Sequence, residues 1–236
     1  MEYPNNIFAI MGALDAEIDE FIKHLDNPKI KNWQEFIFYE GSFCQKNIVI
    51  VKSGMGKVLA ALTTQKLIDT YNPRAIIFTG VAGGLNIEHN IGDIVVARDC
   101  VQHDFDAREL GSARGAIPYT NYRFFETDEY LRTLALSAKS LQTIYEGRIL
   151  TGDSFLTKKE INKNKYLTEE LKGDAVEMEG ASVGQVCTVN DIPFLIIRTI
   201  SDKANEEASV DFNKFLPIVA KNSFHLVSHI LNEYQQ

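Results

Sequence analysis

Three acidic residues stand where predicted strands give way to turns or helices, and carboxylates placed in this way can transfer protons. Glu17 lies in the first turn of a predicted helix after the first strand. Glu179 directly precedes a helix of small residues, and Asp202 ends the most apolar strand. A single acid at such a position is commonly a helix cap, which contributes ~1 kcal/mol to the stability of the helix. Three of them at one sheet edge indicate a shared function instead.

Several carboxylates without a nucleophilic serine or cysteine are typical of glycosyl-bond hydrolysis. In this chemistry one acid protonates the leaving group, another activates water, and a third can bind sugar hydroxyls. Two further patterns contain metal-ligand residue types, namely His225 with His229 and residues 103–106. The first lacks the glutamate of zinc-protease helices and the second is typical of a polar loop. We therefore expect no metal and no cofactor.

Short β-branched runs that alternate with helical segments must bring these acids together. Strands are predicted over residues 7–11, 36–39, 48–52, 75–79, 94–99, 147–151, 175–178 and 194–200. Helical periodicity covers residues 57–71 and the last segment of the chain. This alternation predicts an α/β sandwich with a mostly parallel central sheet. Because no linker or repeat interrupts it, we expect one domain over residues 1–236.

Glycine-rich turns follow several of these strands. Gly12 comes after the first, Gly54 and Gly56 after the third, and residues 80–84 after the fourth. In open α/β sheets, ligands bind at the carboxyl ends of strands, where glycine lets the backbone approach them. The turns therefore predict one pocket at this edge.

Composition excludes several classes of function. The chain has 236 residues, with 24 Lys plus Arg against 32 Asp plus Glu, which gives a net charge of −8. An acidic chain of this kind is repelled by nucleic acid and by anionic membranes. Its apolar runs are far shorter than the ~20 residues that cross a bilayer, and its N-terminus does not resemble a secretory signal. With three widely spaced cysteines, neither disulfides nor a zinc ribbon are indicated. We expect a cytoplasmic protein that binds small molecules.

The chain resembles a known family over essentially its whole length. The resemblance rests on seven motifs in order: GALDAE (residues 12–17), KSGMGKV (52–58), TGVAGGL (79–85), GDIVV (92–96), GDSF (152–155), VEME (176–179) and RTISD (198–202). These motifs resemble those of the 5′-methylthioadenosine/S-adenosylhomocysteine nucleosidases of the nucleoside phosphorylase superfamily. The resemblance implies a three-layer sandwich with a mixed sheet and the hydrolytic release of adenine from thioether nucleosides.

It also implies roles for individual residues. Glu17 would activate water, Asp202 would protonate or hydrogen-bond adenine N7, and Glu179 would hold the ribose hydroxyls above Met178. Phe155 would stack on the purine, and the backbone of Leu156 would read its edge. The other residues implied in substrate binding support Asp202 and the pocket (Ser201, Arg198), belong to the turn after the fourth strand (Val81, Ala82, Gly83) or line the 5′-thioalkyl site (Met55, Phe212, Leu14).

A second subunit is expected to complete that 5′ site with Leu110 and Pro118, which implies a homodimer. Residues 101–118 support this expectation, because they mix apolar and charged side chains over a length unusual for a connection. The alternative is that this stretch forms a lid within one molecule.

Departures from the family pattern leave the 5′ substituent open. Leu14, Val81 and Leu156 stand where many members have methionine, serine and isoleucine, and residues 107–110 also depart. An apolar pocket discriminates one methylene by only ~1–3 kcal/mol. The substrate could be methylthioadenosine, S-adenosylhomocysteine, 5′-deoxyadenosine or a futalosine-type nucleoside.

Two other functions remain as alternatives on this fold. A purine nucleoside phosphorylase would need basic residues aimed at phosphate, and residues 80–84 supply none. If the protein were a binding or adhesion module, nothing would explain why the three acids lie together.

Overall fold

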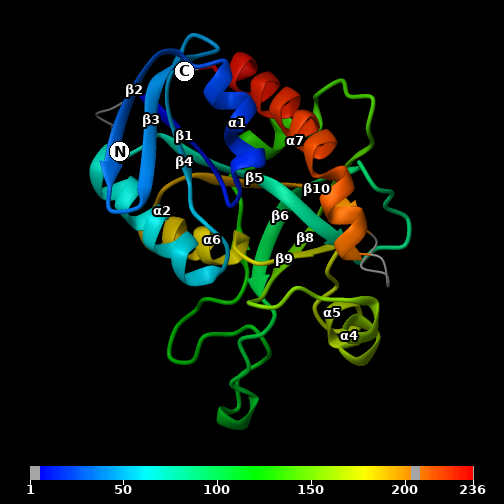
Figure 1. The fold of residues 1–236 in the computed structure, drawn as a ribbon. Coiled ribbons are helices and arrows are strands. Elements are labelled where there is room, and N and C mark those ends of the chain that lie inside the picture. The colour runs from blue at the N-terminus through cyan, green and yellow to red at the C-terminus, as the bar shows by residue number, and fades with distance from the viewer. Residues whose placement is uncertain (1–5, 203–207, 236) are drawn as a thin grey trace.

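The computed structural model describes the backbone of residues 6–202 and 208–235, and the side chains of these residues except 158 and 208–220. The described strands form one ten-stranded sheet, in the order β10-β6-β8-β9-β5-β1-β4-β3-β2, with β7 paired to β6 (Figure 1). The strands are β1 (Ile7–Gly12), β2 (Asp26–Trp33), β3 (Phe36–Phe43), β4 (Lys46–Lys52), β5 (Ala75–Gly84), β6 (Ile94–Gln102), β7 (Phe125–Glu126), β8 (Ile144–Thr151), β9 (Ala175–Glu177) and β10 (Phe194–Asp202).

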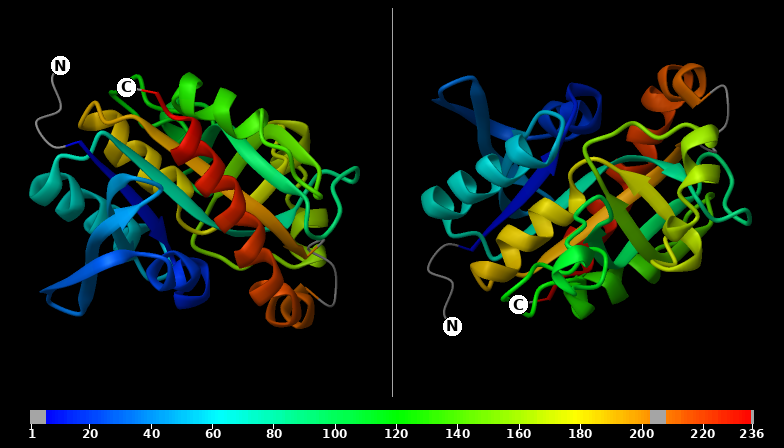
Figure 2. Two further views of the ribbon diagram at one scale, coloured as in Figure 1. Left: turned by 90° about the horizontal axis from the view of Figure 1, so that it is seen from above. Right: turned by 90° about the horizontal axis from the view of Figure 1, so that it is seen from below.

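Helices cover both faces of this sheet. They are α1 (Asp15–Lys23), α2 (Lys57–Tyr71), α3 (Glu129–Leu136), α4 (Lys158–Lys163), α5 (Tyr166–Glu169), α6 (Gly180–Val189), α7 (Ala208–Glu233) and the short 3-10 helix η1 (Arg108–Leu110). Seen from above, α7 lies across the strands (Figure 2). None of the described helices is long and apolar enough to cross a bilayer.

The expected layered α/β architecture with a mixed sheet is confirmed, but the sheet is less parallel than expected. Among the described strands, the five parallel pairings are equalled by five antiparallel ones. Antiparallel pairings that a mostly parallel sheet would lack come from the successive hairpins β2-β3-β4 and from β6, which runs against β10. Since β5 pairs with both β9 and β10, the strands β5, β10, β6, β8 and β9 close into a ring.

Alternation of side chains along the strands produces two large apolar cores, beside a smaller cluster around Leu150. On β5, Phe78 packs into the core beneath α2 and α6, while its neighbour Ile77 packs into the core beneath α1, α3 and α7. Leu67 of α2 belongs to the first core, and Phe21 of α1 and Val227 of α7 belong to the second. Each buried side chain of this size contributes roughly 1.5–3 kcal/mol. The two cores hold the sheet between its helices, so the strand ends are fixed in space.

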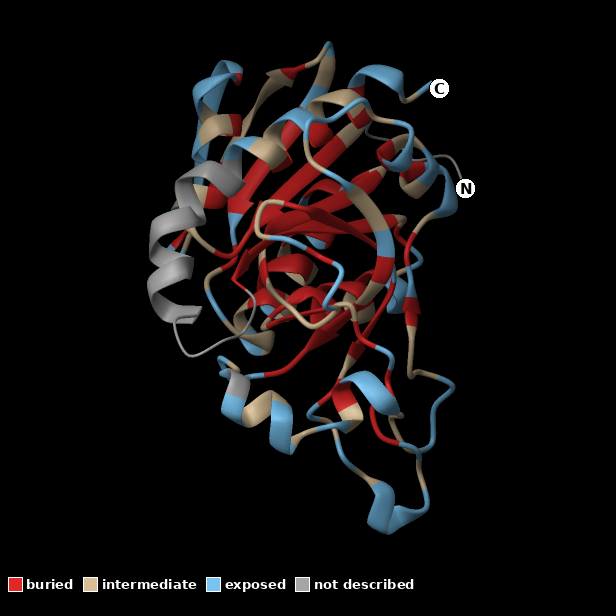
Figure 3. Cartoon of the chain, turned by 90° about the vertical axis from the view of Figure 1, so that its right-hand side faces the viewer, coloured by how far each residue is buried: buried red, intermediate tan, exposed pale blue. Residues whose placement is uncertain are grey.

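Residues 103–124, between β6 and β7, form a long loop that projects away from the sheet (Figure 1). Much of the projecting part is exposed (Figure 3). Leu110 is 70% exposed and Tyr119 is 100% exposed. The loop therefore presents apolar side chains to its surroundings.

Candidate functional site

The three acids that the sequence singled out line one pocket at the carboxyl ends of β1, β5, β9 and β10. The described residues that line it are Ala13, Leu14, Glu17, Met55, Val81, Ala82, Gly83, Ser154, Phe155, Leu156, Val176, Glu177, Met178, Glu179, Ser201 and Asp202. β1, β5 and β10 run parallel and bring their carboxyl ends to one edge, and β9 joins them there by pairing antiparallel with the end of β5 at Gly83 and Gly84.

Glu17 is held by backbone groups from the loop after β1 and from β5. Its Oε2 accepts hydrogen bonds from the N–H groups of Ala13 (2.7 Å) and Leu14 (2.9 Å), and its Oε1 accepts one from Val81 (3.0 Å). A Cβ at Gly80 would lie only 2.5 Å from Glu17 Oε1, so glycine is required for this approach. Burial raises the pKa of Glu17, although the Arg198 charge and the three N–H groups oppose the shift. The result is an oriented carboxylate with enhanced basicity.

Glu179 occupies the position before the first turn of α6. It is 6% exposed, and its Oε1 accepts a hydrogen bond of 2.7 Å from Gly56 N–H. Burial, aided by the neighbouring Glu177, raises the pKa of Glu179 to about 8. Glu179 therefore changes its charge near neutral pH, where ligand hydroxyls can influence its protonation.

Glu177 is a site residue to which the sequence analysis gave no role. Its carboxylate pairs with Arg198 at 2.7 Å (Nη2) and also accepts the Gly180 N–H at 2.7 Å and the Thr151 hydroxyl. A Cβ at Gly180 would lie 3.2 Å from both Glu177 carboxylate oxygens, so a small residue is favoured there. Its signal in the sequence is an acid inside a strand that is otherwise apolar. Glu177 thus fixes the beginning of α6, and with it Glu179.

Arg198 lies beneath the pocket rather than on its wall. It is 1% exposed, and besides Glu177 it donates to the carbonyl of Ile197 (3.1 Å) and that of Phe78 (3.4 Å). Its guanidinium also lies 4.3 Å from the centroid of the Phe78 ring. Arg198 supports the pocket through Glu177, as a buried positive charge close to several buried acids.

Asp202 reaches the pocket through an irregularity in β10. Ile200 pairs with Ala82 and Asp202 pairs with Gly83, so the register shifts at Ser201. Such bulges redirect side chains at the ends of strands. Asp202 is 2% exposed, and the Ser201 hydroxyl lies 2.9 Å from its Oδ2. The side chain is therefore held at a fixed position on the pocket wall.

The rest of the wall is mainly apolar. Met178 and Leu156 are half-buried there, whereas Phe155 is 46% exposed and Met55 is 61% exposed. An aromatic ring and thioether side chains suit a flat heterocycle and a sulfur-containing substituent. The exposure of Phe155 and Met55 shows that the mouth of the pocket is open in the single chain.

Besides Arg198, three of the expected substrate-binding residues are not placed in this pocket. Leu110 and Pro118 lie on the projecting loop and do not line the pocket of their own chain. Phe212 belongs to α7, and its side chain lies outside the described residues.

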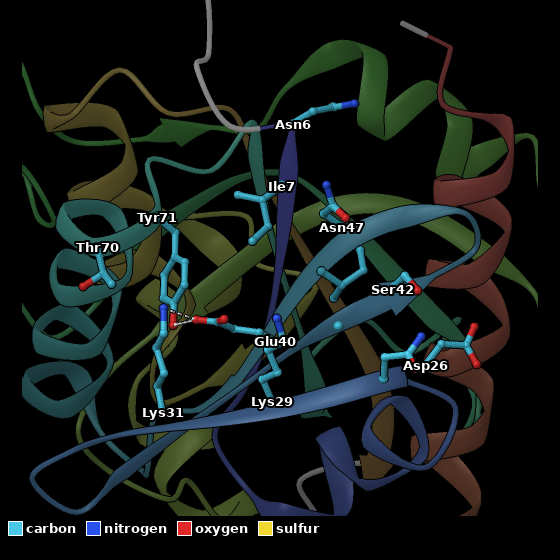
Figure 4. Close-up of a pocket in the computed structure, with 13 residues that line it drawn as sticks. Asn6, Ile7, Asp26, Lys29, Lys31, Glu40, Ser42, Asn47, Thr70 and Tyr71 are labelled. Atoms are coloured by element: carbon cyan, nitrogen blue, oxygen red, sulfur yellow. Dashed lines mark hydrogen bonds and ion pairs between the residues drawn. The ribbon is translucent and has the colours of Figure 1, made fainter.

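A second hollow lies at the opposite edge of the sheet, between the β2-β3-β4 hairpins and α2 (Figure 4). It includes Asn6 and Ile7 at the amino end of β1. Its Glu40 accepts a hydrogen bond from the Tyr71 hydroxyl (2.7 Å) and pairs with Lys31 (2.6 Å). Because ligand sites of such sheets lie at the carboxyl ends of strands, the pocket of the three acids is the better candidate.

Known proteins are similar to this chain in sequence and in fold. The family model described as "Phosphorylase superfamily" matches residues 7–232. A 5′-methylthioadenosine/S-adenosylhomocysteine nucleosidase from Glaesserella parasuis is 34% identical over 232 residues, covering 95% of this chain and 98% of the relative. One from Halalkalibacterium halodurans is 37% identical over 229 residues, covering 94% and 96%.

Solved structures are also similar to this chain. The Neisseria meningitidis nucleosidase of the same name, in complex with methylthio-immucillin-A, is 32% identical and has a TM-score of 0.92, covering 97% of this chain and 100% of that chain. A futalosine hydrolase mutant of Helicobacter pylori is 33% identical with a TM-score of 0.91, again covering 97% and 100%. The chain belongs to the phosphorylase superfamily and, within it, to the 5′-methylthioadenosine/S-adenosylhomocysteine nucleosidase family that its motifs resemble.

Proposed function

We propose that this protein hydrolyses the N-glycosidic bond of 5′-methylthioadenosine, S-adenosylhomocysteine and related 5′-substituted adenosines, releasing adenine and the thioribose. The observation that carries the proposal is the convergence of Glu17, Glu179 and Asp202, which are 6%, 6% and 2% exposed, in one pocket. Buried acids at fixed positions beside an apolar wall provide the groups that glycosyl transfer to water needs.

Each acid has a distinct task in this mechanism. Asp202 donates a proton or a hydrogen bond to N7 of adenine, which makes the base a better leaving group. Glu17 accepts a proton from the attacking water, because its three backbone donors keep the carboxylate oriented. Glu179 binds the ribose hydroxyls, and in its ionised form it stabilises the positive charge that develops on the sugar.

Water is favoured over phosphate as the second substrate. None of the described residues that line the pocket is Lys or Arg, and Val81, Ala82 and Gly83 form the wall beside Glu17. The guanidinium of Arg198 is bound to Glu177 beneath the pocket. Among the residues that the structure describes, a phosphate dianion would therefore face several carboxylates without a cation on the pocket wall to bind it.

Adenine release in phosphate-free buffer tests the proposal. We expect full turnover of 5′-methylthioadenosine without phosphate and no acceleration when phosphate is added. A rate that depends on phosphate would identify a phosphorylase, and binding without adenine release would favour a non-catalytic module.

Futalosine hydrolase activity is a second candidate function, because the chain is similar in structure to the futalosine hydrolase mutant of Helicobacter pylori. Comparison of kcat/KM for methylthioadenosine, S-adenosylhomocysteine, 5′-deoxyadenosine and futalosine decides among the substrates.

We also propose that the protein is a symmetric homodimer. Val58 and Leu62 on α2 are 77% and 47% exposed, and Val189 on α6 is 58% exposed. Val58 and Val189 line one groove between the two helices. Since the opposite face of α2 is already in the core, this second apolar face fits burial against another copy. In such a dimer the exposed Leu110 and Pro118 can complete the open mouth of the neighbouring pocket.

We further infer that residues 1–236 act as one domain in the cytoplasm. A single sheet that joins strands from Ile7 to Asp202 supports the first point. The three cysteines are all free, which fits a reducing compartment.

A further inference from the structure

We propose that Lys57, Asp104 and Asp153 form a charged clamp that holds the backbone N–H of Gly56 against Glu179. The three residues are positioning residues, because they hold the backbone at Lys57 and act on Glu179 through the adjoining N–H of Gly56. The inference rests on the proposed role of Glu179 in binding the ribose.

The turn that carries Gly56 has little rigidity of its own. Gly54 and Gly56 both have left-handed backbone conformations, with φ of 78° and 92°. Glycine is the residue with the greatest backbone freedom, so a turn of this kind needs external contacts to stay in place. Yet the Gly56 N–H must point at Glu179 Oε1, which it contacts at 2.7 Å.

The clamp supplies these contacts from two other loops. Asp153 Oδ1 accepts the backbone N–H of Lys57 at 2.9 Å, immediately beside Gly56. Lys57 Nζ lies 2.7 Å from Asp104 Oδ1 and 3.6 Å from Asp153 Oδ2. Asp104 Oδ2 in turn accepts the backbone N–H of Asp153 at 3.0 Å. The loops that follow β4, β6 and β8 are thereby tied into one unit around the Gly56 turn.

The electrostatics of the clamp agree with its geometry. The Lys57 side chain is 17% exposed, compared with 32% for Asp104 and 50% for Asp153. Burial works to raise the pKa of Asp104, but the hydrogen bonds from Lys57 and Asp153 outweigh it and lower that pKa. An isolated surface ion pair contributes little, whereas a partly buried lysine shared by two carboxylates fixes the relative position of the loops.

A purely structural role is the competing explanation, since Asp153 also caps the first turn of α2. The two roles differ in what they do to ligands. Loss of a cap lowers the melting temperature and affects all ligands alike. Loss of positioning weakens ligands that contact Glu179 and spares adenine, which has no ribose.

The test compares Lys57→Met with Lys31→Met, a matched change of a lysine that pairs with Glu40 outside the pocket. We expect Lys57→Met to raise the KM for 5′-methylthioadenosine about 10-fold, as for a weakened hydrogen bond to a charged group, with the inhibition constant of adenine changed less than about 2-fold. Lys31→Met should leave both constants unchanged. Asp104→Asn, which keeps the side-chain volume, should reproduce the pattern if Lys57→Met folds poorly.

A double-mutant cycle with Glu179→Ala then asks whether the clamp acts through Glu179. In that background Lys57→Met should change nucleoside affinity less than about 2-fold, measured by calorimetry with 5′-methylthioadenosine on proteins that all carry Glu17→Gln, so that the nucleoside is bound and not hydrolysed. Equal weakening of adenine and nucleoside, or full additivity in the cycle, would overturn the positioning role. Absence of adenine release from the unaltered protein would instead contradict the proposed function, and the calorimetric cycle would still report on the clamp.

Discussion

The carboxylate of Glu177 and the guanidinium of Arg198 form an ion pair of 2.7 Å in which both side chains are almost fully buried. This pair leaves Glu17, Glu179 and Asp202 as acids for ligands, because the Arg198 guanidinium beneath the pocket is bound to Glu177. Because Glu177 is paired with Arg198 and the other three acids are left for ligands, four acids can share a pocket and perform different tasks.

Removal of Arg198 is expected to destabilise the fold strongly. Breaking a buried pair by removing one partner costs about 3–5 kcal/mol, since the remaining charge stays buried without compensation. Urea unfolding of Arg198→Met at neutral pH measures this loss of unfolding free energy. The double variant with Glu177→Gln should recover part of it. If Arg198→Met lost less than about 1 kcal/mol, the pair would not be the brace that we describe.

Asp202→Asn should leave the fold intact and lower turnover by ~100-fold to 10,000-fold, the scale of a positioned general acid. Asparagine has nearly the same shape but cannot transfer the proton. Steady-state adenine release at saturating methylthioadenosine provides the measurement, and circular dichroism serves as the control for folding. Near-normal turnover would remove Asp202 from the mechanism.

Glu17→Gln is expected to bind substrate and fail to convert it. Water activation follows binding, so the defect should appear in kcat far more than in affinity. A crystal of this variant with methylthioadenosine should contain the intact nucleoside. Normal turnover, or lost affinity with unchanged turnover, would show that the role given to Glu17 is wrong.

The raised pKa of Glu179 predicts a pH dependence of stability. The folded protein holds a proton on Glu179 up to about pH 8, whereas an unfolded chain releases it near the ordinary value of 4.5. The folded state therefore binds more protons in this window, and the contribution of Glu179 to stability is lost as the pH rises from 4.5 to 8. Glu179→Gln should flatten this part of the unfolding free energy curve, while Glu35→Gln, at an exposed position, should not. Identical slopes for the two variants would contradict the assignment.

Leu110→Asp tests the shared pocket. We expect it to raise the KM for methylthioadenosine and to weaken the dimer, because a charge replaces an apolar side chain at the proposed contact. Light scattering at micromolar concentration reports the mass. A fully active species at the monomer mass of 26.6 kDa would exclude the shared site and favour a lid within one molecule.

The buried part of the fold was predictable from the sequence because burial leaves an apolar, β-branched pattern. Every residue of β10 is buried, and its run of isoleucines indicated a strand. β2 gave no such signal: seven of its eight residues are exposed, and it contains Pro28. Such edge strands form because a neighbouring strand offers hydrogen bonds, which no local pattern encodes.

The residues of the site also differ in how far the sequence could predict them. Glu17 and Asp202 could be located because Glu17 follows the glycine turn after the first strand and Asp202 ends an apolar strand. The register shift at Ser201 and the pairing of Glu177 with Arg198 arise from contacts between distant segments, so their geometry required the structure. Lys57 begins α2, whereas Asp104 and Asp153 lie on two separate loops, so the three residues share no periodicity.

The ring of strands formed by β5, β10, β6, β8 and β9 has a consequence for how activity is acquired. The pocket draws on Glu17 near one end of the chain and on Asp202 near the other, and β10 pairs with a strand that is more than 100 residues earlier. Such long-range pairings form late and slow the folding reaction. Recovery of adenine release during refolding should therefore lag behind the recovery of helical signal, and a nascent chain should stay inactive until β10 has joined the ring.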